Sequence, residues 1–159
     1  MRQGGCASHF ATCLIYTLLL PGSPRNPVRK IDTIIDTLTA AYTSRCQHLL
    51  HAIAEYLPEG TEVWGGKGGF FVWLGLPDGI NAKEVVELAA SMEGVIVASG
   101  SMSECSGEGN TLGWGQKWIR VAVSYCNEEE LVEGIKRLAR AVERWGVGER
   151  ADEAETEVK

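Results

Sequence analysis

The stretch that decides the fold is residues 62–76, EVWGGKGGFFVWLGL, in which two short apolar runs flank a glycine-rich segment. Residues 62–64 and 70–76 are rich in aromatic and β-branched side chains, which favour strands, and the glycines of residues 65–69 suit a turn. The pattern predicts a β-hairpin. Because the second run is apolar at every position, we expect both faces of its strand to be covered.

Shorter elements follow the hairpin. The pattern predicts strands at residues 95–98 and 118–125 and helices at residues 81–92 and 127–148. Asn81 and Asn127 are suited to cap these two helices, and Glu128–Glu130 would lie at the positive end of the second. Strands and helices are mixed without strict alternation. This order is typical of an α+β fold, a small antiparallel or mixed sheet covered by helices.

A long helix is predicted before the hairpin. Apolar residues recur every three or four positions from Val28 to Tyr56, which predicts one continuous helical stripe, and Pro58 and Gly60 end it. At 1.5 Å per residue such a helix spans roughly 45 Å, more than the diameter of a small domain. We expect it to connect two bodies, or to pack against something that the rest of the chain does not supply.

The 159 residues are enough for one domain with additions. We expect residues 1–27 to be a lead-in with a short helix, which Ser8 could cap. Residues 28–148 would form the long connector helix and the α+β domain. Residues 149–159 are acidic, have almost no large apolar side chains and are predicted to be disordered.

Composition excludes several classes of function. The net charge is −6 and no four basic residues cluster, which argues against a nucleic-acid binder. The apolar segment at residues 10–20 is too short to span a membrane and favours a buried helix. Its length also fits the core of a secretion signal, although Pro21 and Pro24 suit the signal peptidase poorly.

The cysteines and histidines predict no metal site. The five cysteines are odd in number and none shares a CxxC spacing, so we expect free thiols and a cytoplasmic protein. His9, His48 and His51 do not form a ligand set. The glycine-rich segment at residues 65–69 lacks the pattern of a phosphate-binding loop.

Arg120 is the candidate site residue, because it lies inside the apolar run of residues 118–125, where an unpaired cation is costly. One interpretation is an anion-binding residue, since a guanidinium matches a carboxylate or phosphate in two parallel hydrogen bonds. The other is an exposed arginine on the polar face of an edge strand. The nearby loop at residues 99–115 is long enough to suggest a function.

Between about Gly4 and Trp145 the chain carries an ordered set of motifs: GGCASHF at residues 4–10, YTSRC at 42–46, GGFFVWLGLP at 68–77, GVIVASG at 94–100, IRVAVSY at 119–125 and GIKRLARAV at 134–142. Their order resembles the C-terminal part of class I/II aminotransferases, pyridoxal-phosphate enzymes of fold type I. The most specific motif is residues 68–77, which is similar to the family's GGxFxWxxLP strand. The branch that the chain is most similar to acts on aromatic amino acids, kynurenine and 2-aminoadipate.

The resemblance implies that Arg120 binds the α-carboxylate of the substrate and that the loop at residues 99–115 lies near its side chain. The parent enzyme would be a homodimer that transfers an amino group from an amino acid to a 2-oxo acid. Ser99 stands where the family has proline and Ser103 where an aromatic residue is common, which leaves the substrate open.

The family's chemistry needs a lysine in an S-x-S-K context to hold pyridoxal phosphate. None of the lysines has that context: Lys30, Lys67, Lys83, Lys117, Lys136 and Lys159. We therefore expect a fragment that binds no cofactor covalently and is inactive alone, with no catalytic residue of its own. The alternative is a non-catalytic α+β module that binds an anion or a partner protein and regulates a full-length relative.

Overall fold

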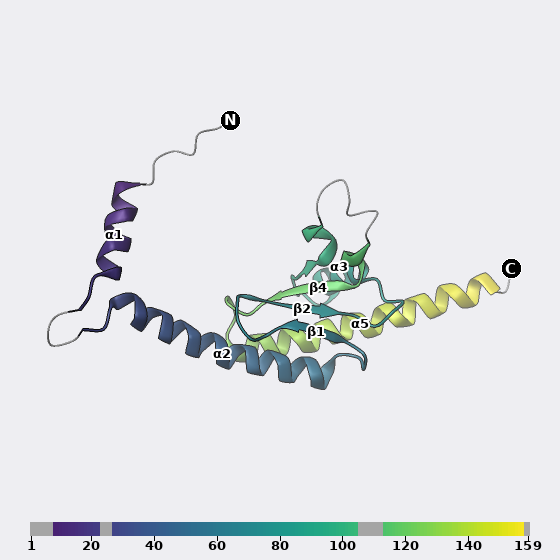
Figure 1. Cartoon of the computed structure of the whole chain (residues 1–159). Coiled ribbons are helices and arrows are strands. Elements are labelled where there is room, and N and C mark those ends of the chain that lie inside the picture. The colour runs from purple at the N-terminus through teal and green to yellow at the C-terminus, as the bar shows by residue number, and fades with distance from the viewer. Residues whose placement is uncertain (1–7, 23–26, 105–112, 158–159) are drawn as a thin grey trace, which may run out of the picture. The chain divides into compact units, whose positions relative to one another are not determined.

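The computed structural model describes residues 8–22, 27–104 and 113–157, with side chains as far as residue 148. Figure 1 shows helices beside a small sheet, which confirms the α+β class. The elements in chain order are α1 (His9–Leu19), α2 (Lys30–Tyr56), β1 (Glu62–Gly65), β2 (Phe71–Gly75), α3 (Ala82–Met92), β3 (Ala98–Ser99), the 3-10 helices η1 (Gly100–Ser103) and η2 (Trp114–Gln116), β4 (Trp118–Ala122) and α5 (Glu128–Glu157).

The sheet has the strand order β1-β2-β4-β3, and each neighbouring pair is antiparallel. The predicted hairpin is confirmed as β1 and β2. β3 is shorter than predicted and does not include residues 95–97. The amide of Val95 donates to the carbonyl of Ala89 at 2.9 Å, so the chain there still closes the end of α3, and Ile96 is 91% exposed.

One face of the sheet packs against helices. Along β2 and β4, alternate side chains are buried, and they join one core with the second part of α2, with α3 and with α5. In Figure 1 the sheet lies in front of α3 and α5. The largest fully buried side chains are Leu49, Leu74, Leu76, Ile119, Leu138, Val72, Val85 and Val123.

The opposite face of the sheet, here called the outer face, was not predicted. The register places on it Trp64 of β1, Phe71 and Trp73 of β2, and Trp118, Arg120 and Ala122 of β4. Phe71 is 44% exposed, and Trp73 is half-buried. The expectation that both faces of β2 are covered is therefore wrong for these residues, because apolar residues at every position do not say whether a second layer is present.

The chain divides into two compact units, Met1–Ala41 and Tyr42–Lys159. In the first unit α1 has no buried side chain, so the expected burial of this helix is wrong in the described chain. Ile35 and Leu38 of the α2 stripe are exposed there. In the second unit the same stripe is buried at Cys46, Leu49 and Ile53.

α5 continues as a helix to Glu157, past the point where the sequence predicted a disordered tail. Residues 149–157 are mostly alanine, glutamate and arginine, which have high helix propensity, and this outweighs their lack of apolar side chains. The domain limits at residues 27 and 148 stay predictions. Within the described residues, no helix combines the length and the apolar character that a membrane crossing requires.

Candidate functional site

Arg120 lies in β4, which has β2 on one side and β3 on the other. β4 is therefore not an edge strand, and the interpretation of Arg120 as an edge-strand arginine is wrong. Its neighbours Ile119 and Val121 point into the core, so the alternation of the strand turns Arg120 to the outer face. There its side chain is half-buried.

The guanidinium of Arg120 contacts an aromatic ring instead of a carboxylate. Its Cζ lies 4.5 Å from the centroid of the Phe71 ring. In the register, Arg120 is directly opposite Trp73 on one side and Ala98 on the other. No Asp or Glu of the described chain forms an ion pair with it. The cation is thus positioned by an apolar surface and free to bind an anion.

Backbone hydrogen bonds fix this part of β4. The amide of Val123 donates to the carbonyl of Phe70 at 2.9 Å, and the amide of Leu76 donates to the carbonyl of Lys117 at 3.0 Å. These bonds extend the β2–β4 pairing beyond both ends of the strands. The position of Arg120 is therefore set by a rigid central strand and not by a loop.

The YTSRC segment anchors α2 to the end of β4. Arg45 donates from Nη1 to the carbonyl of Ser124 at 3.1 Å, and its Cζ lies 5.7 Å from the centroid of the Tyr42 ring. Tyr42 meets Phe70 edge to face, with ring centroids 5.5 Å apart. Sequence reasoning gave these residues no role, because only the fold brings residue 45 to residue 124.

Four tryptophans on the outer face surround a cavity of about 290 Å³, here called the tryptophan box: Trp64, Trp73, Trp114 and Trp118. From the sequence, these tryptophans were predicted to lie in the core or at an interface, and nothing indicated that they form one group. Three come from different strands and one from η2, so only the strand register reveals that they converge.

The loop at residues 99–115 is described only in part, since residues 105–112 lie outside the described chain. Its ends are held together, because the carboxylate of Glu104 accepts a hydrogen bond from the amide of Gly115. The hydroxyls of Ser99, which is buried, and Ser101 lie 2.9 Å apart. The predicted place of this loop near a substrate side chain stays a prediction.

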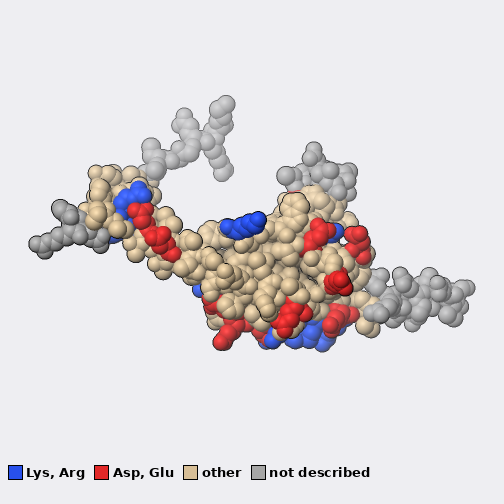
Figure 2. All heavy atoms as spheres, turned by 60° about the horizontal axis from the view of Figure 1, so that its bottom comes forward, with Lys and Arg blue, Asp and Glu red and all other residues tan. Residues whose placement is uncertain are grey.

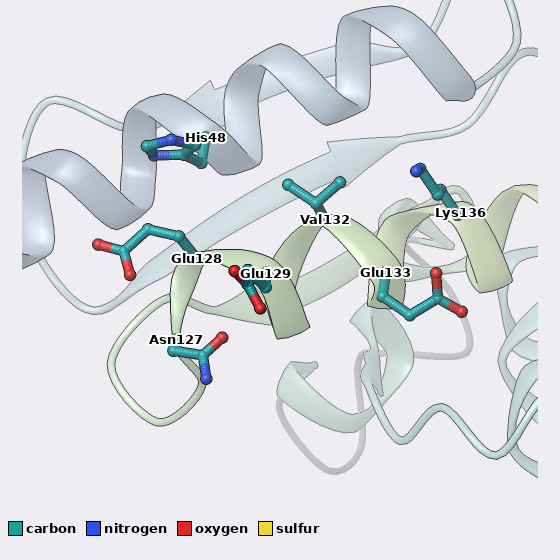
Figure 3. A pocket seen from close by; sticks show the side chains of 7 residues that line it. All are labelled: His48, Asn127, Glu128, Glu129, Val132, Glu133 and Lys136. Atoms are coloured by element: carbon teal, nitrogen blue, oxygen red, sulfur yellow. The ribbon is translucent and has the colours of Figure 1, made fainter.

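A larger hollow of about 780 Å³ lies between α2 and the start of α5, away from Arg120. Figure 3 shows His48 on α2 above Glu128 and Glu129 on α5. Asn127 and Glu130 cap α5 reciprocally, each amide donating to the other's side chain at 2.9 Å. The acidic residues thus form a helix start, as the sequence indicated, and His48 hydrogen bonds through Nδ1 to the carbonyl of Ser44 at 2.9 Å.

Elsewhere in the described chain, ion pairs with acidic residues are formed by Arg29, Lys117, Arg137, Arg140 and Arg144. On the side drawn in Figure 2, most basic side chains lie beside acidic ones. Among the described cysteines, Cys13, Cys46 and Cys126 are free thiols, and burial raises the pKa of Cys46. Cys6 and Cys105 lie outside the described residues. The side chains that the structure places hold no cluster with the ligands of a metal site.

Lys117 and Lys136 are held by contacts that do not match the surroundings of a Schiff-base lysine. A Schiff-base lysine needs a pKa lowered by its surroundings, whereas Lys117 hydrogen bonds to Glu62 at 2.7 Å, which raises its pKa. Lys136 lies with Nζ 4.9 Å from the centroid of the Tyr56 ring, on the helix side of the sheet. Lys159 is outside the described residues.

Comparison with known proteins gives the family. A profile described as "Aminotransferase class I and II" matches residues 27–138. The chain is 31% identical over 112 residues to "Aromatic-amino-acid aminotransferase 1" of Thermococcus litoralis, covering 70% of this chain and 25% of that protein. It is 29% identical over 108 residues to the "2-aminoadipate transaminase" of Thermus thermophilus, covering 68% of this chain and 25% of that protein.

A solved structure agrees with these matches. The α-aminoadipate aminotransferase LysN of Thermus thermophilus, in complex with N-(5'-phosphopyridoxyl)-L-leucine, superposes with a TM-score of 0.64 at 26% identity. The match covers 74% of this chain and 28% of that one. The chain thus spans about a quarter of the length of these relatives. The resemblance inferred from the motifs is confirmed: the chain belongs to the class I and II aminotransferases.

Proposed function

We propose that the chain is the small-domain part of a pyridoxal-phosphate-dependent aminotransferase, in which Arg120 binds the α-carboxylate of the substrate. The observation that carries the proposal is the geometry of Arg120. Its guanidinium is held on the outer face by Phe71 and has no carboxylate partner in the described chain. The reaction would transfer an amino group from an aromatic or 2-aminoadipate-like amino acid to a 2-oxo acid.

The chemistry of a guanidinium suits this role. Its planar fork of N–H groups matches the two oxygens of a carboxylate, and such a pair fixes orientation as well as binding. A ring stacked on the guanidinium leaves the N–H edges free to bind. Because a rigid strand carries Arg120, the bound acid would be held in one orientation, which brings its α-carbon to a defined place.

The cofactor would have to be held by another part of the parent enzyme. Pyridoxal phosphate supplies an electron sink for the amino-group chemistry when bound. Because no lysine of the sequence stands in an S-x-S-K context, we propose that this chain binds the cofactor non-covalently at most and turns nothing over by itself. The proposed substrate class, aromatic or 2-aminoadipate-like amino acids, is taken from the names of the two relatives. A homodimeric parent and a cytoplasmic location belong to the same proposal.

A chimera tests the proposed function. The matching segment of this chain replaces its counterpart in the aromatic-amino-acid aminotransferase of Thermococcus litoralis, and oxo-acid formation from phenylalanine and 2-aminoadipate is measured. We expect a folded, cofactor-loaded chimera to catalyse transamination. A chimera that folds and binds the cofactor but forms no oxo acid from any amino acid would contradict the proposal.

A second experiment tests the chain alone. The purified chain is mixed with pyridoxal phosphate, reduced with borohydride and digested for mass spectrometry. We expect scattered adducts far below one per chain. A single stoichiometric adduct at one lysine would show that the chain forms its own cofactor site.

The non-catalytic module remains the second candidate because the first unit exposes many apolar side chains, among them Phe10, Ile15, Ile35 and Leu38. Such side chains suit a partner surface. Genomic sequence upstream of Met1 discriminates the two. A reading frame that continues into an S-x-S-K segment favours the aminotransferase, and a promoter directly before Met1 favours the module.

A further inference from the structure

The tryptophan box is a formed cavity on the outer face. The ring centroids of Trp64 and Trp118 are 5.8 Å apart with planes at 74°, and those of Trp73 and Trp114 are 6.0 Å apart at 60°. A Cβ at Gly75 would lie 3.0 Å from the Trp118 ring, so only glycine lets that indole lie across β2. Aromatic contacts of this kind hold the rings in place without a ligand.

The box is open to solvent and apolar. Trp64 is 66% exposed and Trp114 is 43% exposed, so these large rings do not serve as core. Exposed apolar surface that is gathered in one place marks a binding site more often than scattered apolar residues do. A cavity of about 290 Å³ lies at the small end of ligand sites, which suits a single ring.

A cation without a partner lies next to the box. Trp64 is directly opposite Trp73 in the register, and Trp73 is directly opposite Arg120, so the three side chains form one row across the outer face. The Cβ atoms of directly opposite residues stand roughly 5 Å apart, and the guanidinium of Arg120 lies over the Phe71 ring on the same face. Lys117 is already neutralised by Glu62 at 2.7 Å and Asp78 at 3.4 Å.

We propose that the tryptophan box and Arg120 together bind a small carboxylic acid that bears an aromatic ring, the carboxylate on Arg120 and the ring among the indoles. The proposal rests on the proposed function in one respect, because Arg120 is the carboxylate anchor in both. It adds that the box selects the side chain and that this chain binds such acids without the cofactor.

The charge of Arg120 decides among the possible occupants. Aromatic boxes also accept quaternary ammonium groups, but the unpaired positive charge of Arg120, a residue directly opposite Trp73 in the register, would repel a cation. A purely apolar occupant, such as a side chain of a partner protein, would leave that guanidinium without an anion. An acid with a ring satisfies both features.

The test follows the indole N–H resonances of the full chain by NMR during titration with 3-phenylpropanoate, which cannot transaminate. We expect the signals of the four box tryptophans to shift. Trp145 serves as internal control, because its indole donates to Glu84 at 2.7 Å outside the box. Three comparison compounds should each bind at least about tenfold more weakly than 3-phenylpropanoate. Propanoate lacks the aromatic ring, and 3-phenylpropan-1-ol and phenyltrimethylammonium lack the carboxylate.

Variants separate the two halves of the site. Arg120→Gln should weaken 3-phenylpropanoate roughly tenfold and leave 3-phenylpropan-1-ol unchanged. Trp64→Ala, at an exposed position of the edge strand β1, should weaken the acid about threefold to tenfold. Trp114→Ala gives the same result if Trp64→Ala disturbs the fold. Arg137→Gln, which removes a charge from α5, is the matched control.

Several results would overturn the proposal: no shift of the box indoles at saturating acid, propanoate as tight as the ring-bearing acid, tighter binding of the ammonium compound, or no effect of Arg120→Gln. These results are independent of the chimera. If the chimera is inactive, the proposed function is contradicted, whereas the ligand-induced shifts of the indole N–H signals are unaffected by that result. If the chimera is active and its KM depends on Arg120, but the box indole signals do not shift with ring-bearing acids, the proposed function stands and the proposed role of the tryptophan box is wrong.

Discussion

The guanidinium carbon of Arg120 lies 4.5 Å from the centre of the Phe71 ring, across the β2–β4 pairing. The two residues are not opposite each other in the register, since Phe71 pairs with Ala122. The side chain of Arg120 therefore runs diagonally along the outer face. The ring takes the place that an acidic residue has in an ordinary ion pair, and the positive charge stays available.

The contact between Phe71 and Arg120 is expected to affect the KM for amino acids. In the chimera, Phe71→Leu should raise the KM for amino acids about twofold to fivefold with little change in kcat, because the stacking that orients the guanidinium is lost. Phe70→Leu is the matched control, since Phe70 contacts Tyr42 instead. An unchanged KM for Phe71→Leu would mean that the ring does not position Arg120.

The close packing around Gly100, beside the loop at residues 99–115, leads to a prediction about stability. A Cβ there would lie 2.7 Å from the carbonyl oxygen of Gly115 and 2.9 Å from Cβ of Trp118. Gly100→Ala should lower the free energy of unfolding by about 1–3 kcal/mol, measured by urea denaturation, and should change the near-ultraviolet dichroism of Trp118. Gly134→Ala on α5 meets no atom within 4 Å and should stabilise by about 0.5–1 kcal/mol. Equal effects of the two variants would argue against the close approach.

The ion pairs of Glu93 with α5 are expected to contribute to the free energy of unfolding. Its side chain is 6% exposed and binds Arg140 at 2.8 Å and Arg144 at 3.1 Å. Glu93→Gln should cost about 1–3 kcal/mol in urea denaturation, because two arginines lose a charged partner. Glu133→Gln, which changes a side chain that is itself 48% exposed, should have a much smaller effect. A cost for Glu93→Gln no larger than that control would contradict the role of this pair.

Glu128 predicts a dependence of stability on pH. Hydrogen bonding to its own backbone amide and then to Ser44 lowers its pKa. A carboxyl whose pKa is lower in the folded state stabilises above its unfolded pKa of about 4.3, and this is lost as the pH falls through the folded pKa. Glu128→Gln should therefore have a lower urea midpoint than the parent at neutral pH and the same midpoint in strong acid. A difference that stays constant down to about pH 2 would refute this.

Much of the local structure could be predicted from the sequence. Residue periodicity and capping residues gave the helices, and in the structure Asn81 accepts a hydrogen bond from the amide of Lys83 at 3.0 Å, as a cap should. The glycine-rich turn gave the hairpin. These features depend on residues that are close in sequence, so the pattern contains the necessary information.

The misses depend on contacts between distant segments. The exposure of Phe71, the exposed α1 and the short β3 follow from what packs against them, which an apolar pattern does not state. Arg120 was found because a cation in an apolar run is rare, and the resemblance gave it a role. The tryptophan box was missed because it needs the register of three strands.

The most direct test of the central claim is the KM for amino acids of the chimera when Arg120 is changed. Arg120→Gln should raise KM roughly tenfold to a hundredfold, since a charged hydrogen-bonding partner of the carboxylate is lost. Arg120→Lys should recover part of the loss, because it keeps the charge and not the fork. Arg137→Gln should leave KM unchanged. A folded, active Arg120→Gln chimera with a KM within twofold of the parent would contradict the account.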